Sequence, residues 1–205
     1  MVKQTRAKPM STEDRQQAIL DAVTPLIVER GSKVTTSEMA KAAGVAEGTI
    51  YSVFPDKHSL IIAAVRASLD PAAVQAAVGN IDRTQSLQMQ LQDAATILAD
   101  RIERVMALFD ALRSLPNHSH HDGKHARRFI AQTEAAVTET LTELLEAHRD
   151  DLAIEPVRAA SALRGLIFAI RHPMLPPDQR LTVEEAVTIL ISGIASRHTT
   201  TKTGS

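Results

Sequence analysis

Residues 35–57 have the sequence TTSEMAKAAGVAEGTIYSVFPDK, and this short stretch contains the strongest fold signals of the chain. Thr35 and Glu38 form a T-x-x-E capping box, in which each side chain satisfies a backbone amide at a helix start. Gly44 suits the position just after a helix, where the backbone turns left-handed. A further helix starts at Glu47 and must stop before the next proline. The pattern predicts two short helices joined by a tight turn.

Small and apolar residues in this stretch have the spacing of a helix-turn-helix. Ala40 supplies a small side chain where the second helix crosses the first, and Val45 is expected to supply a buried apolar residue after the turn. Ile50 provides the inward-facing anchor of the second helix. The alternative is an ordinary corner of an all-α protein, which does not need this whole set of residues.

Over residues 31–60 the chain resembles the DNA-binding signature of TetR-type transcriptional regulators. The family pattern is Ile-Ala-x-x-Ala-Gly-Val, then Gly-Thr-Leu/Ile-Tyr-x-x-Phe, then Lys and Leu. The matching residues are Met39-Ala40, Ala43-Gly44-Val45, Gly48-Thr49-Ile50-Tyr51, Phe54, Lys57 and Leu60. Val53 departs from the pattern, because many members have His or Tyr there. The resemblance implies that residues 47–54 form the recognition helix.

The resemblance implies a set of DNA contacts that the side-chain chemistry constrains. The recognition helix contains no Lys or Arg, so a bidentate arginine contact with guanine is absent from it. Readout is left to hydroxyl, methyl and ring groups, while neighbouring helix starts contact phosphates. A packing role is the alternative for Tyr51. The expected DNA contacts are Thr35, Thr36, Ser37, Gly48, Thr49, Tyr51, Ser52 and Lys57.

The composition indicates an all-α protein. Apolar residues make up 44% of the 205 residues, but aromatic residues only 2%. A core of Ala, Leu, Ile and Val favours helix-on-helix packing over a β-sandwich or barrel. Helical periodicity gives about nine helices and no strand. Beyond the helix-turn-helix, the expected helices include 84–112, 125–149, 156–171 and 183–197.

Several classes of protein are disfavoured by the sequence. The absence of cysteine excludes disulfides and thiolate metal sites. The N-terminus lacks the apolar segment of a signal peptide, and the longest uncharged apolar run, 165–170, is too short to span a bilayer. No catalytic triad, phosphate-binding loop or paired E-x-x-H helix occurs. We therefore expect a cytoplasmic protein that is not an enzyme, contains no cofactor and does not bind a membrane.

The chain is expected to contain two domains with a flexible segment at each end. Lys3, Arg6 and Lys8 give the N-terminal arm a positive charge, which suits either contact with phosphates or a solubilising role. Pro25 is expected to kink or weaken the first helix. The expected regions are the arm at 1–10, the helix-turn-helix domain at 11–58, the effector-binding and dimerisation domain at 59–198 and a disordered tail at 199–205.

The last two predicted helices are the best candidates for a dimer interface. One helix-turn-helix contacts too few phosphates and bases, so two copies on adjacent half-sites are needed. Residues 156–171 contain small residues that allow close helix approach, and residues 183–197 carry a broad apolar stripe. Paired across a two-fold axis, they would form a four-helix bundle. Part of each stripe must serve the intramolecular core.

The resemblance also implies a pocket for a small-molecule effector among the long helices. Flexible or bulky side chains are the candidates to line it. These candidates are Met89, Met106, Phe109, Phe129, Phe168 and Met174. Arg101, Glu134 and Arg164 are candidate polar partners of the ligand, although a solvated helix face explains each of them equally well.

A histidine-rich loop at 114–124 provides the main alternative. It contains His118, His120 and His121, and His121 stands four residues before His125, a spacing that suits zinc or nickel on a helix. Without cysteine, exposed imidazoles are favoured over a metal site. We expect a ligand-responsive repressor that acts as a homodimer on a palindromic operator. The alternatives are a metal-binding helical protein, a metal-responsive regulator or a helical protein-interaction module.

Overall fold

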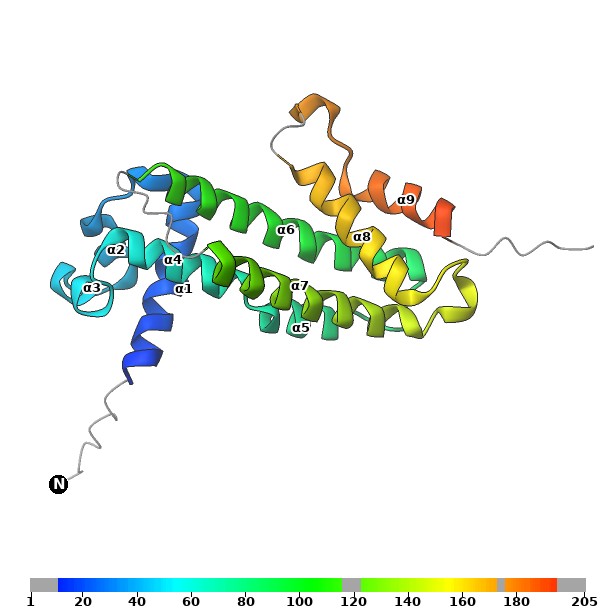
Figure 1. Ribbon diagram of the computed structural model, residues 1–205, viewed down its shortest axis with the longest axis horizontal. Helices are drawn as coiled ribbons and strands as arrows, with labels where there is room; N and C mark the ends of the chain where they lie inside the picture. The colour runs from blue at the N-terminus through cyan, green and yellow to red at the C-terminus, as the bar shows by residue number, and fades with distance from the viewer. Residues whose placement is uncertain (1–10, 116–122, 173–175, 195–205) are drawn as a thin grey trace, which may run out of the picture. The chain divides into compact units, whose positions relative to one another are not determined.

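The computed structural model describes residues 11–115, 123–172 and 176–194, which are helical with short connections and contain no strand (Figure 1). The predicted all-α class is confirmed. The α-helices are α1 (Thr12–Arg30), α2 (Thr36–Ala43), α3 (Glu47–Val53), α4 (Lys57–Leu69), α5 (Pro71–Gly79), α6 (Leu87–Arg113), α7 (Gly123–Glu146), α8 (Pro156–Arg171) and α9 (Val183–Ile194). Short 3₁₀ helices occupy Gly31–Lys33 (η1), Arg149–Asp151 (η2) and Pro177–Gln179 (η3).

Some regions predicted from the sequence lie outside the described residues. These are the arm at 1–10, the tail at 199–205, the last three positions of the helix predicted at 183–197, and most of the loop at 114–124.

The first helix, α1, is continuous despite its internal proline. Ser11 caps its start by accepting a hydrogen bond from the Asp14 amide at 3.0 Å. Pro25 removes one backbone hydrogen bond, yet the helix continues through it to Arg30. Burial of the apolar side chains Ile19, Leu20, Val23 and Ile27 stabilises the helix against that loss.

Contacts between residues divide the chain into two compact units. The first unit contains α1, α2, α3, α4 up to Ser68 and the part of α6 from Arg104 onward. Within it, α1 packs against α2 and α3, and α2 packs against α3. The second unit contains Leu69, α5, α6 up to Glu103, α7, α8 and α9. In this unit α7 packs against α5 and α8, and α8 packs against α9.

The core of the second unit is aliphatic, as the composition predicts. Leu98 of α6, Leu141 of α7 and Leu163 of α8 are all almost fully buried in one cluster with side chains of α5 and α9. Among the described residues, this cluster consists only of Ala, Val, Leu and Ile. Such side chains fill a helical interior closely and support the three long helices on which the charged residues discussed below are placed.

Among the described residues, one helical stretch, Lys57–Gly79, is long and apolar enough by length and composition to cross a membrane. The sequence-based expectation considered only the apolar run at 165–170 and overlooked this stretch. It is interrupted where Asp70 caps α5 by accepting from the Ala72 amide at 2.9 Å. Core helices of soluble proteins pass the same test, so the stretch is weak support for a membrane span.

Candidate nucleic-acid interface

The capping box predicted at the start of α2 is present. Thr35 Oγ1 accepts from the Glu38 amide at 3.2 Å, and the Glu38 carboxylate accepts from the Thr35 amide at 2.8 Å. The same carboxylate accepts from the Thr35 hydroxyl at 2.9 Å and from Arg30 at 2.7 Å. These hydrogen bonds, that of the Thr35 amide above all, lower the pKa of Glu38 to about 2. The Glu38 carboxylate therefore stays ionised at neutral pH and keeps its hydrogen bonds with Thr35 at the start of α2.

The turn between α2 and α3 has a left-handed backbone geometry that favours a glycine. Gly44 adopts φ 65° and ψ 29°, and its amide donates to the carbonyls at the end of α2. Any other residue would be strained at this left-handed position. Ala40 is buried where α2 meets α3, whereas Val45 is only half-buried. The two helices therefore cross closely, as the spacing of small residues predicted.

The inner face of α3 is anchored in the core of the first unit. Ile50 and Phe54 are each 3% exposed. The helix ends at Val53, one residue before the predicted end, and Phe54 adopts an extended backbone. The following Pro55 explains this, because a residue before proline avoids the helical region. Anchoring on one face fixes which side chains of α3 point outward.

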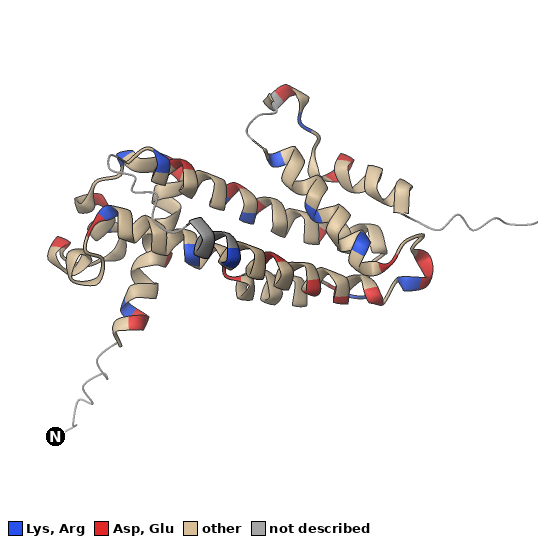
Figure 2. Ribbon diagram, viewed as in Figure 1, with Lys and Arg blue, Asp and Glu red and all other residues tan. Residues whose placement is uncertain are grey.

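Several side chains expected to contact DNA lie on the outer face of α3. Tyr51 is 52% exposed, Gly48 and Ser52 are exposed, and Thr49 is half-buried. The Tyr51 hydroxyl lies 3.1 Å from the Thr36 hydroxyl, which links α3 to the start of α2. The Ser52 hydroxyl donates to the Thr49 carbonyl at 2.8 Å, so its oxygen remains free to accept. Figure 2 shows an acidic residue but no basic one on α3.

Lys57, another expected DNA contact, has partners within the chain. Its ammonium group donates to the carbonyls of Ser32 and Val34. Partial burial lowers the pKa of Lys57. Lys57 therefore holds the segment that leads into α2, and a substitution there would move this segment as well as remove a positive charge.

Two exposed basic residues near α2 were not singled out from the sequence. Lys33 lies in η1, and Lys41 lies in the last turn of α2. Among the remaining expected contacts, Thr35 and Ser37 are exposed and Thr36 is half-buried. For Lys33, the position two residues before the capping box was the available signal, because phosphate contacts cluster around helix starts.

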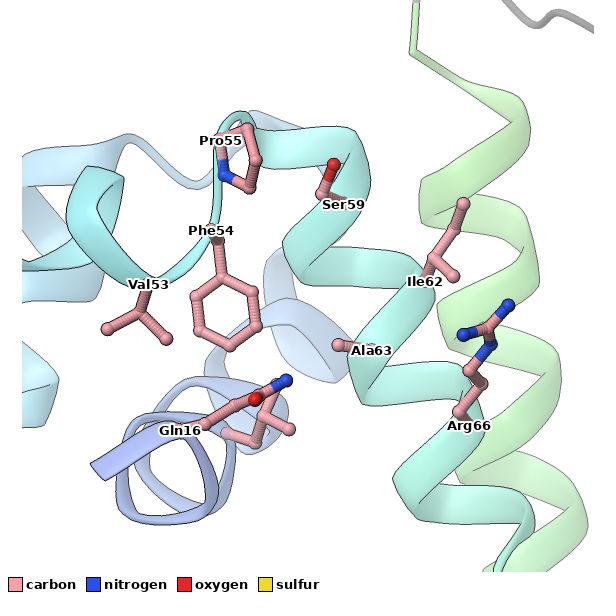
Figure 3. Close-up of a pocket in the computed structure, with 9 residues that line it drawn as sticks. Gln16, Val53, Phe54, Pro55, Ser59, Ile62, Ala63 and Arg66 are labelled. Atoms are coloured by element: carbon pink, nitrogen blue, oxygen red, sulfur yellow. The ribbon is translucent and has the colours of Figure 1, made fainter. Parts of the chain in front are cut away.

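A groove of about 440 Å³ lies beside the end of α3 in the first unit (Figure 3). Apolar side chains of α1, α3 and α4 form most of its wall, and Gln16, Ser59 and Arg66 add polar groups. The lining residues are Gln16, Leu20, Val53, Phe54, Pro55, Ser59, Ile62, Ala63 and Arg66. None of the expected DNA or effector contacts lines this groove, so it is separate from the outer face of α3.

The residues expected to line an effector pocket are divided between the two units and differ in their exposure. In the second unit, Met89, Phe129 and Phe168 are 47%, 38% and 49% exposed, so they lie at its surface. In the first unit, Met106 and Phe109 are half-buried. Met174 lies outside the described residues.

The predicted histidine cluster lies outside the residues whose side chains the structure describes. Within the described part of the chain, no group of three or more His, Asp or Glu side chains could hold a metal ion.

Comparison with known proteins finds a family match for the segment that contains this interface. The model of the bacterial regulatory proteins of the tetR family matches residues 19–64. This segment is therefore similar to the TetR family over those residues. Over 57 residues, the chain is 40% identical to the nucleoid occlusion factor SlmA of Haemophilus ducreyi. That match covers 27% of this chain and only 28% of the length of the relative.

Solved structures show a likeness of fold that extends beyond residues 19–64. A TetR transcriptional regulator from Streptomyces coelicolor has a TM-score of 0.60 and 22% identity, and the match covers 88% of this chain and 98% of that one. A protein from Rhodococcus sp., described as a TetR-family transcriptional regulator, has a TM-score of 0.53 and 21% identity, covering 87% and 96%. At these identities the likeness shows a shared fold.

Proposed function

We propose that this chain is a DNA-binding transcriptional regulator whose helix α3 binds in the major groove of an operator. The outward face of α3 is the observation that carries the proposal. Ile50 and Phe54 fix the helix in the core, while Tyr51 and Gly48 face solvent. A helix held on one side, with ring, hydroxyl and methyl groups on the other, suits base contacts in the groove.

Contacts with the DNA backbone are proposed for the start of α2. The first amides of a helix have no partner within it and carry partial positive charge, which favours phosphate. Thr36 and Ser37 occupy these positions. Lys33 adds exposed positive charge just before them, and Lys41 adds it in the last turn of α2. Thr35 and Lys57 contribute mainly by holding the segment that leads into α2.

We infer that the protein acts as a homodimer on a palindromic operator. The packed helices α8 and α9 have large apolar side chains at their surface, since Val157, Phe168 and Ile189 are 50%, 49% and 55% exposed. Exposed Ser161 and Gly165 stand on α8 between the first two. This strip suits a second copy of the same helices, because small residues allow close approach and the apolar groups leave water.

The second unit is proposed to bind a small-molecule effector that releases the protein from DNA, so that the protein acts as a repressor. An effector changes occupancy only through its different affinity for the DNA-binding and released states. The likeness of fold to TetR-family regulators supports this division of roles.

The first test is binding to the DNA upstream of the protein's own gene. We expect a gel shift whose affinity falls about 10³- to 10⁵-fold between 50 and 200 mM salt, because phosphate contacts release counterions. A scrambled duplex of the same length should bind more weakly at every salt concentration. Salt-independent binding, or no preference for the upstream DNA, would contradict the proposal.

Substitution of Gly48 by Ala should separate stability from DNA binding. Apart from its two chain neighbours and the nearby backbone of its own helix, a Cβ at this position meets no atom within 4 Å. Alanine should therefore stabilise the helix by about 0.5–1 kcal/mol. If the DNA backbone approaches this glycine, the added methyl group should lower operator affinity about tenfold. Thermal unfolding and fluorescence anisotropy measure the two effects.

Gly79→Ala in α5 is the matched control for this substitution, since its Cβ also meets nothing within 4 Å. It should leave operator affinity unchanged. Equal affinity of Gly48→Ala and the unmodified protein would remove Gly48 from the interface.

A further inference from the structure

Three charged residues from three helices of the second unit meet around one carboxylate. Glu134 Oε1 on α7 accepts from Arg101 Nη1 on α6 at 2.9 Å, and Glu134 Oε2 accepts from Arg164 Nη2 on α8. Arg164 Nη1 also donates to Thr138 Oγ1, and Arg101 Nη2 donates to the Leu69 carbonyl at 3.1 Å. The Arg101 side chain is only 8% exposed, so a solvated helix face does not explain it.

This cluster has more positive than negative charge. Two guanidinium groups share a single carboxylate, which leaves one cation in excess. Removing a cation from water is costly unless an anion neutralises it. The side chains of Arg164 and Glu134 are 24% and 30% exposed, so one side of the cluster is open to solvent.

One buried donor of the cluster is also unsatisfied. Nε of Arg101 is buried without a hydrogen-bond partner in the described structure. Buried donors rarely remain unpaired, and each such case needs a physical reason. A guanidinium group carries five donors in a planar fork that matches the two oxygens of a carboxylate. A second carboxylate would satisfy both the unpaired donor and the excess charge.

We infer that this cluster binds the carboxylate of a small organic acid, which replaces Glu134 on at least one guanidinium group. Ile97 and Ile130 stand one helical turn before Arg101 and Glu134, and both are half-buried. Residues four apart lie on the same helix face, so apolar surface adjoins the charged group. The acid is therefore one with a short hydrocarbon body. Its role as effector rests on the proposed function, whereas its binding does not.

The test uses the full-length protein without DNA and three sodium salts as probes: butanoate, octanoate and benzoate. Butanol, octanol and benzyl alcohol are the uncharged counterparts. Calorimetry and thermal unfolding should show that at least one acid binds saturably and raises Tm, while its alcohol does not. Arg164→Gln should weaken this binding at least about tenfold, because it removes one guanidinium group.

Glu134→Gln provides the complementary measurement. It removes the internal carboxylate with little change in volume, so the added acid should raise Tm more in this variant than in the unmodified protein. Arg158→Gln, an exposed position on the same helix as Arg164, should bind the acid normally. If Glu134→Gln does not fold, comparison of acid binding by the unmodified protein and by Arg164→Gln still tests the inference.

Binding of none of the three acids would overturn the inference, as would equal binding by Arg164→Gln. Suppose that the acid raises the Tm of folded Glu134→Gln no more than it raises that of the unmodified protein. This result would overturn the inference that the acid takes the place of Glu134. These failures leave the gel-shift result untouched, because DNA binding is measured without acid. A protein that binds the acid but not its upstream DNA would instead overturn the proposed regulator function.

Discussion

Replacing both Phe168 and Ile189 by Asp should convert the protein into a monomer and lower operator affinity by more than about a hundredfold. Both side chains are about half exposed in the single chain, so the substitutions place no charge in its core. In the proposed dimer, however, each protomer would bury two carboxylates against apolar helices. Loss of the second recognition helix then removes a gain from joint binding of about 10²- to 10⁴-fold.

Sedimentation and fluorescence anisotropy test this prediction directly. Met89→Asp on α6 is the matched control, since Met89 is a large apolar side chain with 47% exposure. It should remain dimeric and retain operator affinity. When all of these proteins are compared as monomers, the free energy of unfolding of each variant should differ little from that of the unmodified protein, as is usual for surface substitutions. A double variant that stays dimeric would place the interface elsewhere.

Tyr51→Ala should lower operator affinity about 5- to 150-fold without destabilising the fold. The side chain is 52% exposed on α3, and a good base contact contributes about 1–3 kcal/mol of binding. Tyr51→Phe should have an intermediate effect, because it retains the ring but loses the hydroxyl that meets Thr36. Competition between operator and scrambled DNA should show reduced discrimination, not merely weaker binding.

Ser52→Ala compares Tyr51 with a neighbouring expected DNA contact. The Ser52 hydroxyl already donates to the carbonyl of Thr49, so only its oxygen is left to accept from DNA, and its removal should lower operator affinity less than Tyr51→Ala does. Unchanged affinity in Tyr51→Ala would show that the outer face of α3 does not contact DNA through this ring. Unfolding of Tyr51→Ala would instead assign the ring a packing role.

Local signals made much of the candidate interface predictable. The capping box of Thr35 and Glu38 forms between residues three apart, and Gly44 adopts the left-handed conformation that ends α2. The end of α3 was misplaced by one residue because Pro55 acts on the conformation of its predecessor. The pairing of Thr35 with Glu38 was predicted, whereas the predicted role of Lys57 as a DNA contact did not consider its partners within the chain.

The sequence by itself determined the all-α class and the helix-turn-helix, since caps, turns and apolar periodicity act between residues within a few helical turns. Only the tertiary structure decided which charged groups meet. Glu134 is 33 positions from Arg101 and 30 from Arg164, and Lys57 is 25 positions from Ser32. No local spacing encodes such pairs, because they form only when the packing of buried apolar faces brings separate helices together.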